Sequence, residues 1–307
     1  MPRIACVVNP RSANGKTGRR WPEIRKALVQ HLGEVRGYLT KSPGHATALA
    51  RQAVEEGAEL VISVGGDGTN NEVLNGLFRD GRPISEGVAM SVIPGGTGGD
   101  FARLLQIPKD PAAAAKRLAG AKPRPIDVGL LTCADHEGAT IRRMFLNIAS
   151  FGLGGEVDAR VNRTTKIFGG FASFFWASLT TLFAYKNRHV RLRVDDFLDE
   201  ERVIQQVSVA NGQYFGGGMW IAPGARLDDG LFDIVISGDF TRGESLRSGR
   251  DIYKGAHVHH PKVQVLRGRK ISAESGEITL IDMDGEQPGR LPLTVEVVPG
   301  ALLFLGA

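Results

Sequence analysis

The stretch from Leu60 to Leu77 constrains the fold more than any other, because it combines a strand, a turn and a helix start. It reads LVISVGGDGTNNEVLNGL. The first five residues are an apolar, β-branched run of the length typical of a strand buried on both faces. After the turn, Asn70 and Asn71 are suitable caps for a helix with Glu72 in its first turn. The apolar residues predicted to face inward from that helix are Val73, Leu74 and Leu77.

The turn in this stretch combines glycines with an acid. Gly65, Gly66 and Gly68 allow close backbone approach and positive φ, so that N–H groups and the helix N-terminus can point at a phosphate. Asp67 lies among them, where a carboxylate is unfavourable unless a cation separates it from the phosphates. The turn therefore predicts a phosphate site with Mg²⁺ held directly or through water.

A second unit of the same kind follows in the chain. Val88 to Ile93 is typical of a strand, residues 94–99 (PGGTGG) of a loop, and Asp100 begins a helical pattern. One such loop is often an ordinary β–α turn, because short glycine motifs have many false matches. Two of them in one sheet favour a nucleotide site.

The first part of the chain alternates strands and helices. Strand patterns at Ile4–Val8 and Val35–Leu39 precede the Leu60 strand, with helical patterns at Arg20–His31 and His45–Glu56 between them. This order predicts a mostly parallel, Rossmann-like or NAD kinase-like sheet. Right-handed crossovers then place both glycine loops at its carboxyl edge. We expect an α/β nucleotide-binding domain over residues 1–128.

The pattern changes after a helix at Ala112–Ala119, where Pro123 and Pro125 interrupt it. From residue 129 the segments are typical of strands separated by glycine and acidic turns, which predicts an antiparallel β-sandwich acceptor domain over residues 129–298. The apolar tail at 299–307 is expected to pack back on the first domain. The predicted strands of the second domain are Arg142–Ala149, His189–Val194, Val203–Ala210, Leu231–Ile236, Lys262–Val265, Lys270–Ala273 and Leu293–Val298.

A helix is predicted as an insertion in the second domain. Ile167 to Tyr185 is a run of 19 uncharged residues, which is long enough for a transmembrane span. Phe171, Phe175 and Leu182 fall on one helical face and hydroxyl residues dilute the rest, which favours a one-sided helix. A core helix, a helix that faces lipid, and a span all stay open at this stage.

The cysteines indicate a reducing compartment, and the histidines lack the spacing of a metal site. Cys6 and Cys133 are the only cysteines, so there is no disulfide framework and a reducing compartment such as the cytoplasm is favoured. The start MPRIACVVNP lacks the apolar core and cleavage site of a secretory signal. His257, His259 and His260 are expected at the surface or an interface, without the spacing of a metal site.

Positive charge is concentrated in one segment. The net charge of the chain is +5, whereas Arg242 to Lys270 holds eight Lys and Arg against two Asp and Glu. Such a segment either contacts an anionic membrane surface or is a solvated face. Nucleic acid is disfavoured as a partner, because Tyr253 is the only Phe, Trp or Tyr there and no groove-reading motif is present.

Two of these stretches together resemble a known family. GGDGTNNEVLNGL and PGGTGGDFARLLQIP are similar to the diacylglycerol kinase catalytic domain, and in particular to bacterial lipid kinases related to diacylglycerol and sphingosine kinases. GGDG alone also occurs in NAD kinases and phosphofructokinases. The family usually has Asn where this chain has Gly99, so the hydrogen bonds of that amide are absent. Further matching positions are 8–12, Thr40, 44–46, 126–129, Asn211, 216–219, Ala222, Pro223, 227–231 and 284–286.

The resemblance implies ATP and Mg²⁺ as cofactors. Asp67 would organise the metal and the phosphates, with Asp100 and Asp127 supporting the ionic network, although a structural cap is an alternative role for Asp127. The other residues that the resemblance places around the nucleotide are Asn9, Ser12, Thr40, Gly65, Gly66, Gly68, Thr69, Asn70, Glu72 and Thr97.

Two further sites are implied in the second domain. The backbone carbonyls of Arg226 and Leu231 and the side chain of Asp229 would bind a structural magnesium ion, with an acidic turn without metal as the alternative. Glu286, in the sequence MDGE, would accept the proton of the acceptor hydroxyl, a task that phosphorylation of an alcohol requires. A solvated glutamate in a β-turn is the alternative there.

The resulting hypothesis is a cytoplasmic, ATP- and Mg²⁺-dependent kinase that phosphorylates a diacylglycerol-like or sphingoid-like lipid. It would make transient contact with the inner face of an anionic membrane, and a homodimer is compatible with it. A soluble-metabolite kinase of the NAD kinase type and a non-catalytic nucleotide- or lipid-binding regulator are the alternatives. The sequence does not select the lipid.

Overall fold

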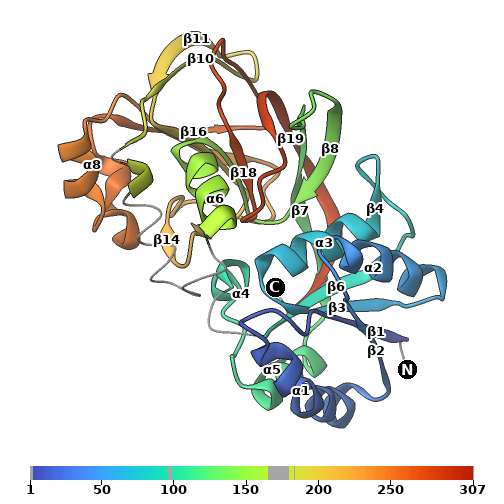
Figure 1. Cartoon of the computed structure of the whole chain (residues 1–307). Coiled ribbons are helices and arrows are strands. Elements are labelled where there is room, and N and C mark those ends of the chain that lie inside the picture. The colour runs from blue at the N-terminus through green and yellow to red at the C-terminus, as the bar shows by residue number, and fades with distance from the viewer. Residues whose placement is uncertain (1–2, 96–98, 165–179, 183, 307) are drawn as a thin grey trace. The chain divides into compact units, whose positions relative to one another are not determined.

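The chain divides into two compact units, each with its own core. A computed structural model describes residues 3–95, 99–164, 180–182 and 184–306 (Figure 1). The first unit is Met1–Val128 with Pro299–Ala307, and the second is Gly129–Val298. Two strands, β7 (Pro123–Ala134) and β19 (Arg290–Leu305), contribute residues to both units.

The first unit is built on a parallel sheet, as the alternation of strands and helices predicts. Its strands lie in the order β19-β6-β3-β1-β2, and every pair among them is parallel. The end of β19 joins this sheet through Leu303 opposite Ala89 and Phe304 opposite Met90. The apolar run at the end of the chain is therefore a strand of this sheet, and β19 also pairs with β7. The strand bounds are β1 Ile4–Val8, β2 Val35–Leu39, β3 Leu60–Gly65 and β6 Ala89–Pro94.

Helices cover both faces of this sheet (Figure 1). Helices α2 and α3 pack together on one face, and α1 packs with α5 on the other. The chain runs from β1 to β2 in one direction and from β2 through β3 to β6 in the other, so right-handed crossovers place α1 on one face and α2 and α3 on the other. The helices are α1 Lys16–Leu32, α2 His45–Glu55, α3 Asp67–Leu77, α4 Asp100–Leu104 and α5 Pro111–Ala119, with a short hairpin formed by β4 Phe78–Arg79 and β5 Arg82–Pro83.

The start of α3 corrects one expectation. The helix begins at Asp67 with Gly66 as its N-cap, and no side chain caps it. Asn70 and Asn71 lie inside the helix and are buried, so they are not the caps that the sequence predicts. Val73, Leu74 and Leu77 are buried as expected.

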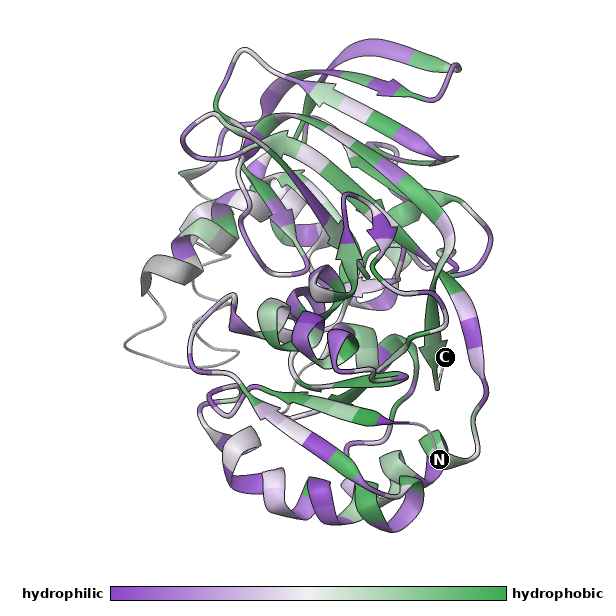
Figure 2. Cartoon of the chain, turned by 90° about the vertical axis from the view of Figure 1, so that its right-hand side faces the viewer, coloured by the Kyte–Doolittle hydropathy of each residue, from purple (hydrophilic) through white to green (hydrophobic). Residues whose placement is uncertain are grey.

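The second unit contains two antiparallel sheets that share one core. Strands β16-β15-β12-β9-β18 form one sheet, and β11-β10-β17-β19 form the other, with β8 paired to β7. Phe151 and Phe232 from the first of these sheets pack with Ile271 and Val295 from the second. This confirms the predicted antiparallel architecture. The hydrophobic colour of Figure 2 follows the strands of both units.

The elements of the second unit have the following bounds: β8 Thr140–Phe145, β9 Ile148–Gly152, α6 Leu153–Thr164, β10 Arg188–Val194, β11 Leu198–Ile204, β12 Gln206–Ala210, β13 Tyr214–Phe215, β14 Met219–Trp220, β15 Phe232–Ser237, α8 Arg242–Ser248, η1 Ile252–Lys254, η2 Ala256–His259, β16 Val263–Gly268, β17 Lys270–Glu274 and β18 Ile281–Met283.

Three predicted elements differ in the structure. The expected strand Arg142–Ala149 is two strands, β8 and β9, because a turn at Leu146 and Asn147 separates them. The expected strand Val203–Ala210 is likewise the end of β11 followed by β12. The expected strand Leu293–Val298 is the middle of the longer β19, which continues into the first unit.

Two further expectations concern the helix insertion and the histidines. Most of the Ile167–Tyr185 run, residues 167–179 and 183, lies outside the described residues. Among the described residues no helix is long and apolar enough to cross a membrane. His257 is buried, contrary to the expectation of a surface position, and its Nε2 lies 3.0 Å from the carbonyl oxygen of Ile221. Burial lowers the pKa of His257.

Candidate active site

The polar residues predicted in the first unit follow the carboxyl ends of its parallel strands. Asn9 follows β1, Thr40 follows β2, Gly66 follows β3 and Gly95 follows β6. These ends meet at one edge of the sheet, which is where open α/β sheets bind ligands. The Gly95 N–H donates to the Gly65 carbonyl oxygen at 2.9 Å, so the two glycine loops begin in direct contact.

Asp67 joins the two glycine loops. Its carboxylate accepts the N–H of Asp100 at 2.8 Å and the N–H of Phe101 at 3.3 Å, both at the start of α4. Burial raises the pKa of Asp67, and these two N–H donors oppose that shift. A cation beside this buried carboxylate would stabilise its charged form.

The glycines of the first loop are required for close contact. A Cβ on Gly65 would lie 2.5 Å from Thr69 Oγ1, so a side chain there would displace the start of α3. A Cβ on Gly66 would meet nothing within 4 Å, and its φ of −111° is open to any residue. Positive φ, expected from the sequence, is not used at Gly65 or Gly66. The space beside the Gly66 Cα atom is instead open.

The Asn9–Ser12 turn is tied to the GGDGT loop. Asn9 Nδ2 donates to Thr69 Oγ1 at 3.1 Å, and Ser12 Oγ donates to the Asn9 carbonyl oxygen at 2.9 Å. The Ser12 hydroxyl also lies 2.5 Å from Thr17 Oγ1. The N–H of Thr40 is bound by the Val8 carbonyl oxygen at 2.9 Å. The structure thus brings Asn9, Ser12 and Thr69 together as the sequence predicts, and holds them by mutual hydrogen bonds.

Two residues predicted at the nucleotide have other partners. Glu72 accepts the N–H of Gly44 and of Ala46, each at 2.9 Å, so its carboxylate caps the N-terminus of α2. Asn70 is buried and its Oδ1 accepts the Ser63 hydroxyl at 2.7 Å. Both side chains therefore stabilise the loop through contacts with other protein groups.

Asp127 and Thr97 complete the predictions for the first unit. Asp127 is buried and accepts the Gly300 N–H at 2.7 Å, which ties β7 to β19. This contact fits the structural alternative considered for Asp127. Thr97 lies outside the described residues.

In the second unit the MDGE sequence forms a tight turn anchored by Asp284. The Met283 N–H donates to the Glu286 carbonyl oxygen at 2.8 Å, and Asp284 has a left-handed φ of 51°. The Asp284 carboxylate accepts three backbone N–H groups, from Leu146 at 2.9 Å and from Asn147 and Ile148 at 3.0 Å each. The turn that carries Glu286 is therefore fixed to the β8–β9 connection.

Glu286 is held by an arginine that the sequence does not single out. Arg143 Nη2 lies 2.7 Å from Glu286 Oε2, and the two side chains are 28% and 29% exposed. This ion pair is made through Oε2 and does not occupy Oε1. Arg143 lies on β8, directly before the residues that bind Asp284. One short segment thus anchors the MDGE turn and orients its glutamate.

Other polar residues missed by the sequence reasoning reinforce this turn. Asp282 Oδ1 accepts the Gly285 N–H at 3.0 Å, and its Oδ2 accepts the Ser150 hydroxyl at 3.2 Å. Asn211 Nδ2 donates to the Leu146 carbonyl oxygen at 2.7 Å. The family-like Asn211-Gly212 pair was the only signal for this contact in the sequence.

The carboxylate of the magnesium site implied at residues 226–231 has an arginine partner. Arg267 Nη2 forms an ion pair with Asp229 Oδ2, and Arg267 Nε lies 3.1 Å from Asp233 Oδ1. Asp229 Oδ1 accepts the Leu231 N–H at 3.2 Å. A guanidinium therefore lies beside the only proposed carboxylate ligand, and the magnesium site and the acidic turn without metal both stay predictions.

The donor set around Asp67 fits a magnesium ion with few protein ligands. Each Asp67 oxygen accepts one backbone N–H, from Asp100 or Phe101, and a carboxylate oxygen can accept more than one contact. Among the described residues no group of three or more His, Cys, Asp or Glu side chains could hold a metal. Mg²⁺ at Asp67 would consequently take most of its ligands from water and phosphate oxygens, as it commonly does.

Two family models match the chain. Residues 3–131 match the diacylglycerol kinase catalytic domain, and residues 147–306 match the YegS C-terminal NAD kinase beta sandwich-like domain. The chain belongs to the diacylglycerol kinase family of YegS-like lipid kinases. The matches cover both units, so membership does not depend on the glycine loops alone.

Individual relatives agree with this assignment along most of their length. A diacylglycerol kinase of Staphylococcus carnosus is 29% identical over 94% of this chain and 90% of its own. A Chromohalobacter salexigens protein named "Probable lipid kinase YegS-like" is 30% identical over 94% and 90%. The crystal structure of a Bacillus anthracis protein assigned as a diacylglycerol kinase superposes with a TM-score of 0.76 at 25% identity, over 99% of this chain and 96% of that one.

Proposed function

We propose that this protein is an ATP- and Mg²⁺-dependent kinase that transfers the γ-phosphate to a hydroxyl of a diacylglycerol-like or sphingoid-like lipid. The observation that carries the nucleotide part is the contact of Asp67 with Asp100 and Phe101, because it joins two glycine loops at one sheet edge. Family membership supports the kinase class and a lipid acceptor.

The first unit would bind the triphosphate. The space beside Gly66 is open, and the N-terminus of α3 would provide backbone N–H groups and a positive dipole end for phosphate oxygens. Asp67 is the carboxylate that would hold Mg²⁺, directly or through water. When bound, Mg²⁺ supplies neutralisation of the phosphate charge. Asn9 and Thr69 keep the loops in position through their mutual hydrogen bond.

The second unit would supply the group that accepts the proton. In the reaction the acceptor oxygen forms a bond to the γ-phosphorus, ADP leaves, and the hydroxyl proton goes to the Glu286 carboxylate. Arg143 holds one oxygen of Glu286, so the other is presented in a defined direction. Asp284 fixes the backbone of the turn. Arg143 and Asp284 are therefore positioning residues.

The test is a phosphotransfer assay on the full chain with labelled ATP, Mg²⁺ and a panel of micellar lipids. Glu286→Gln keeps the size of the side chain and an oxygen for Arg143, and we expect phosphotransfer to fall about 100-fold or more, since general base catalysis contributes roughly 10²–10⁴-fold. Glu296→Gln is the matched control, because Glu296 pairs with Lys270 on the same unit. Wild-type turnover by Glu286→Gln would remove the assigned base.

A kinase for a soluble metabolite is the second candidate. The match of the second unit to a domain described as NAD kinase beta sandwich-like favours it. The same assay separates the two, because a lipid kinase requires a dispersed lipid acceptor, whereas the alternative phosphorylates a nucleotide such as NAD without lipid or detergent. We place the enzyme in the cytoplasm, in transient contact with the inner face of the membrane that holds its acceptor.

A further inference from the structure

Helix α8 presents a solvent-exposed face and is followed by an exposed basic segment. None of the seven residues Arg242–Ser248 is buried. Leu246 is 47% exposed, and Tyr253, in the segment that follows, is 44% exposed. Phe197, Val265 and Ile278 are the other exposed large apolar side chains in the described part of the second unit. We call the exposed set Arg242, Leu246, Arg247, Arg250, Tyr253 and Lys254 the α8 surface.

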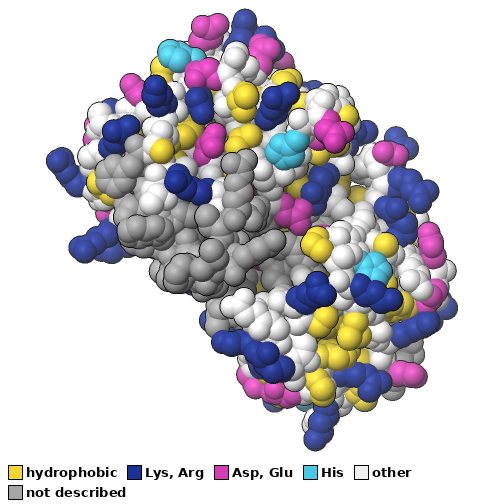
Figure 3. Space-filling model, viewed as in Figure 1, with side chains coloured by type: hydrophobic (Ala, Val, Ile, Leu, Met, Phe, Trp, Pro, Cys, Tyr) yellow, Lys and Arg dark blue, Asp and Glu magenta, His cyan; other side chains and the backbone are white. Residues whose placement is uncertain are grey.

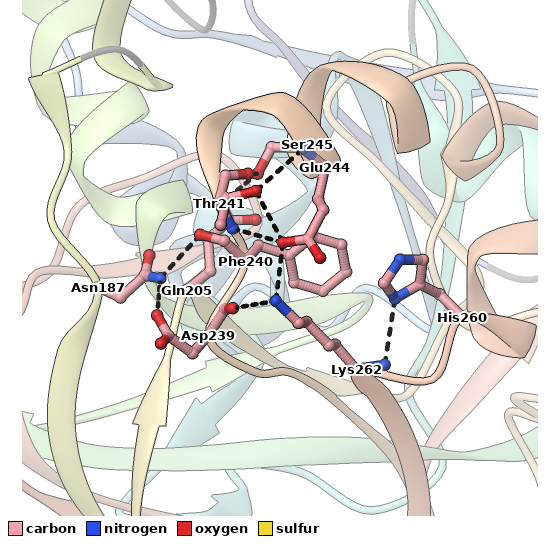
Figure 4. Close-up of polar contacts among 9 residues, drawn as sticks. All are labelled: Asn187, Gln205, Asp239, Phe240, Thr241, Glu244, Ser245, His260 and Lys262. Atoms are coloured by element: carbon pink, nitrogen blue, oxygen red, sulfur yellow. Dashed lines mark hydrogen bonds and ion pairs between the residues drawn. The ribbon is translucent and has the colours of Figure 1, made fainter.

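A polar network fixes α8 in place although the helix buries nothing (Figure 4). Thr241 and Glu244 form a capping box at its N-terminus. Glu244 Oε2 also lies 2.7 Å from Lys262 Nζ, which donates to the Asp239 carbonyl oxygen at 2.8 Å. The contact with Lys262 is the main reason that the pKa of Glu244 is lowered to about 2.

The network continues on the other side of the helix. Gln205 Nε2 donates to the Ser245 hydroxyl at 2.7 Å, and Asn187 Nδ2 donates to Asp239 Oδ1 at 2.6 Å and to the Phe240 carbonyl oxygen at 2.9 Å (Figure 4). An isolated helix of this length is not stable in water. Its polar attachments therefore hold it while its remaining face stays in solvent.

The charge that this face presents is positive. Glu244 is neutralised by Lys262, which leaves Asp251 as the only other acid among residues 241–254. Figure 3 shows Lys and Arg side chains gathered over the side of the molecule where α8 lies in Figure 1. Within the described residues, no ion pair to Asp or Glu involves Arg242, Arg247, Arg250 or Lys254.

We propose that the α8 surface docks the protein on a bilayer that contains anionic phospholipid. The four cations contact lipid phosphates, and Leu246 and Tyr253 insert among the headgroups, where amphipathic and aromatic side chains are favoured. Charge complementarity selects the anionic bilayer over a neutral one. The proposal deepens the proposed lipid kinase function and rests on it for its purpose, but binding to vesicles is measured without nucleotide or turnover.

The experiment measures flotation of the full chain with vesicles of phosphatidylcholine alone or of phosphatidylcholine with about one third phosphatidylglycerol. Removing one cation near an anionic surface lowers binding about fivefold. Charge reversal in Arg247→Glu with Arg250→Glu should therefore lower binding to the anionic vesicles at least tenfold. Leu246→Ser should lower it without any change of charge. High salt should weaken binding by the wild type, because surface electrostatics are screened.

The matched control is Lys26→Glu with Lys116→Glu, which makes the same change of net charge at exposed positions of the first unit. We expect this control to keep wild-type binding within about twofold. Phosphotransfer to a short-chain lipid in neutral detergent should be equal in all variants. Equal binding to neutral and anionic vesicles, or equal losses in the control and in the Arg247/Arg250 variant, would overturn the proposal. If the protein binds anionic vesicles but has no kinase activity, the proposed function is refuted, whereas the proposed docking surface is supported.

Discussion

Asp284→Ala should unfold the second unit locally and reduce phosphotransfer, because one carboxylate satisfies three buried donors. The N–H groups of Leu146, Asn147 and Ile148 lie 2.9 to 3.0 Å from its oxygens. Each buried donor left without a partner costs about 1–3 kcal/mol. Relaxation and water entry reduce the total, so we expect a loss of about 3–5 kcal/mol in the free energy of unfolding.

Asp284→Asn is the control for the backbone contribution. Asn adopts positive φ readily and fits the φ of 51° at this position, but it provides one acceptor oxygen in place of two. We expect a smaller loss than for Ala. The assay is denaturant unfolding together with hydrogen exchange at residues 146–148, which should speed up in the Ala variant. ATP affinity should be unchanged. An Ala variant within about 1 kcal/mol of wild type would refute the assigned role.

Three further predictions concern the loops and the base. Gly65→Ala should cost about 1–3 kcal/mol of stability through its clash with Thr69, whereas Gly66→Ala should keep stability but weaken ATP binding, as melting and nucleotide titration will show. Arg143→Met should lower kcat about 10–100-fold with ATP affinity intact, and Arg143→Lys should restore part of it; an unchanged kcat would exclude a positioning role. The pKa of Asp67 is raised above 3.8, so the stability linked to its protonated form is present below that pH and is lost as the pH rises through the folded-state pKa. Without Mg²⁺, the melting temperature of Asp67→Asn relative to that of the wild type should therefore increase as the pH rises. A difference in melting temperature that does not change with pH would contradict the raised pKa.

Local patterns in the sequence predict much of the first unit. The buried run Leu60–Val64 and the glycines after it are enough to specify a strand and a loop, because apolar periodicity and turn chemistry act over a few residues. The repetition of this unit at Val88–Asp100 predicts that two loops share one sheet edge. The contact of Asp67 with Asp100 then follows from strand order, but the particular atoms that form it could not be predicted.

The contacts that position the base could not be predicted in the same way. Arg143 and Glu286 are 143 positions apart, and Asp284 reaches its partners across a similar distance. Such pairs depend on the register of strands that are distant in sequence. The partner of Glu72 could not be predicted either. Its position in the GGDGTNNE motif does not indicate that it caps the N-terminus of α2. The ion pair between Arg267 and Asp229 is another contact that links residues distant in sequence.

The central claim is that the two loops joined by Asp67 bind the triphosphate. The most direct measurement is a crystal structure of the full chain with Mg²⁺ and a non-hydrolysable ATP analogue. The account predicts phosphate oxygens in contact with the backbone N–H groups around Gly66 and Gly68, with Mg²⁺ beside the Asp67 carboxylate. A nucleotide bound elsewhere, with the space in front of Gly66 filled only by water, would contradict it.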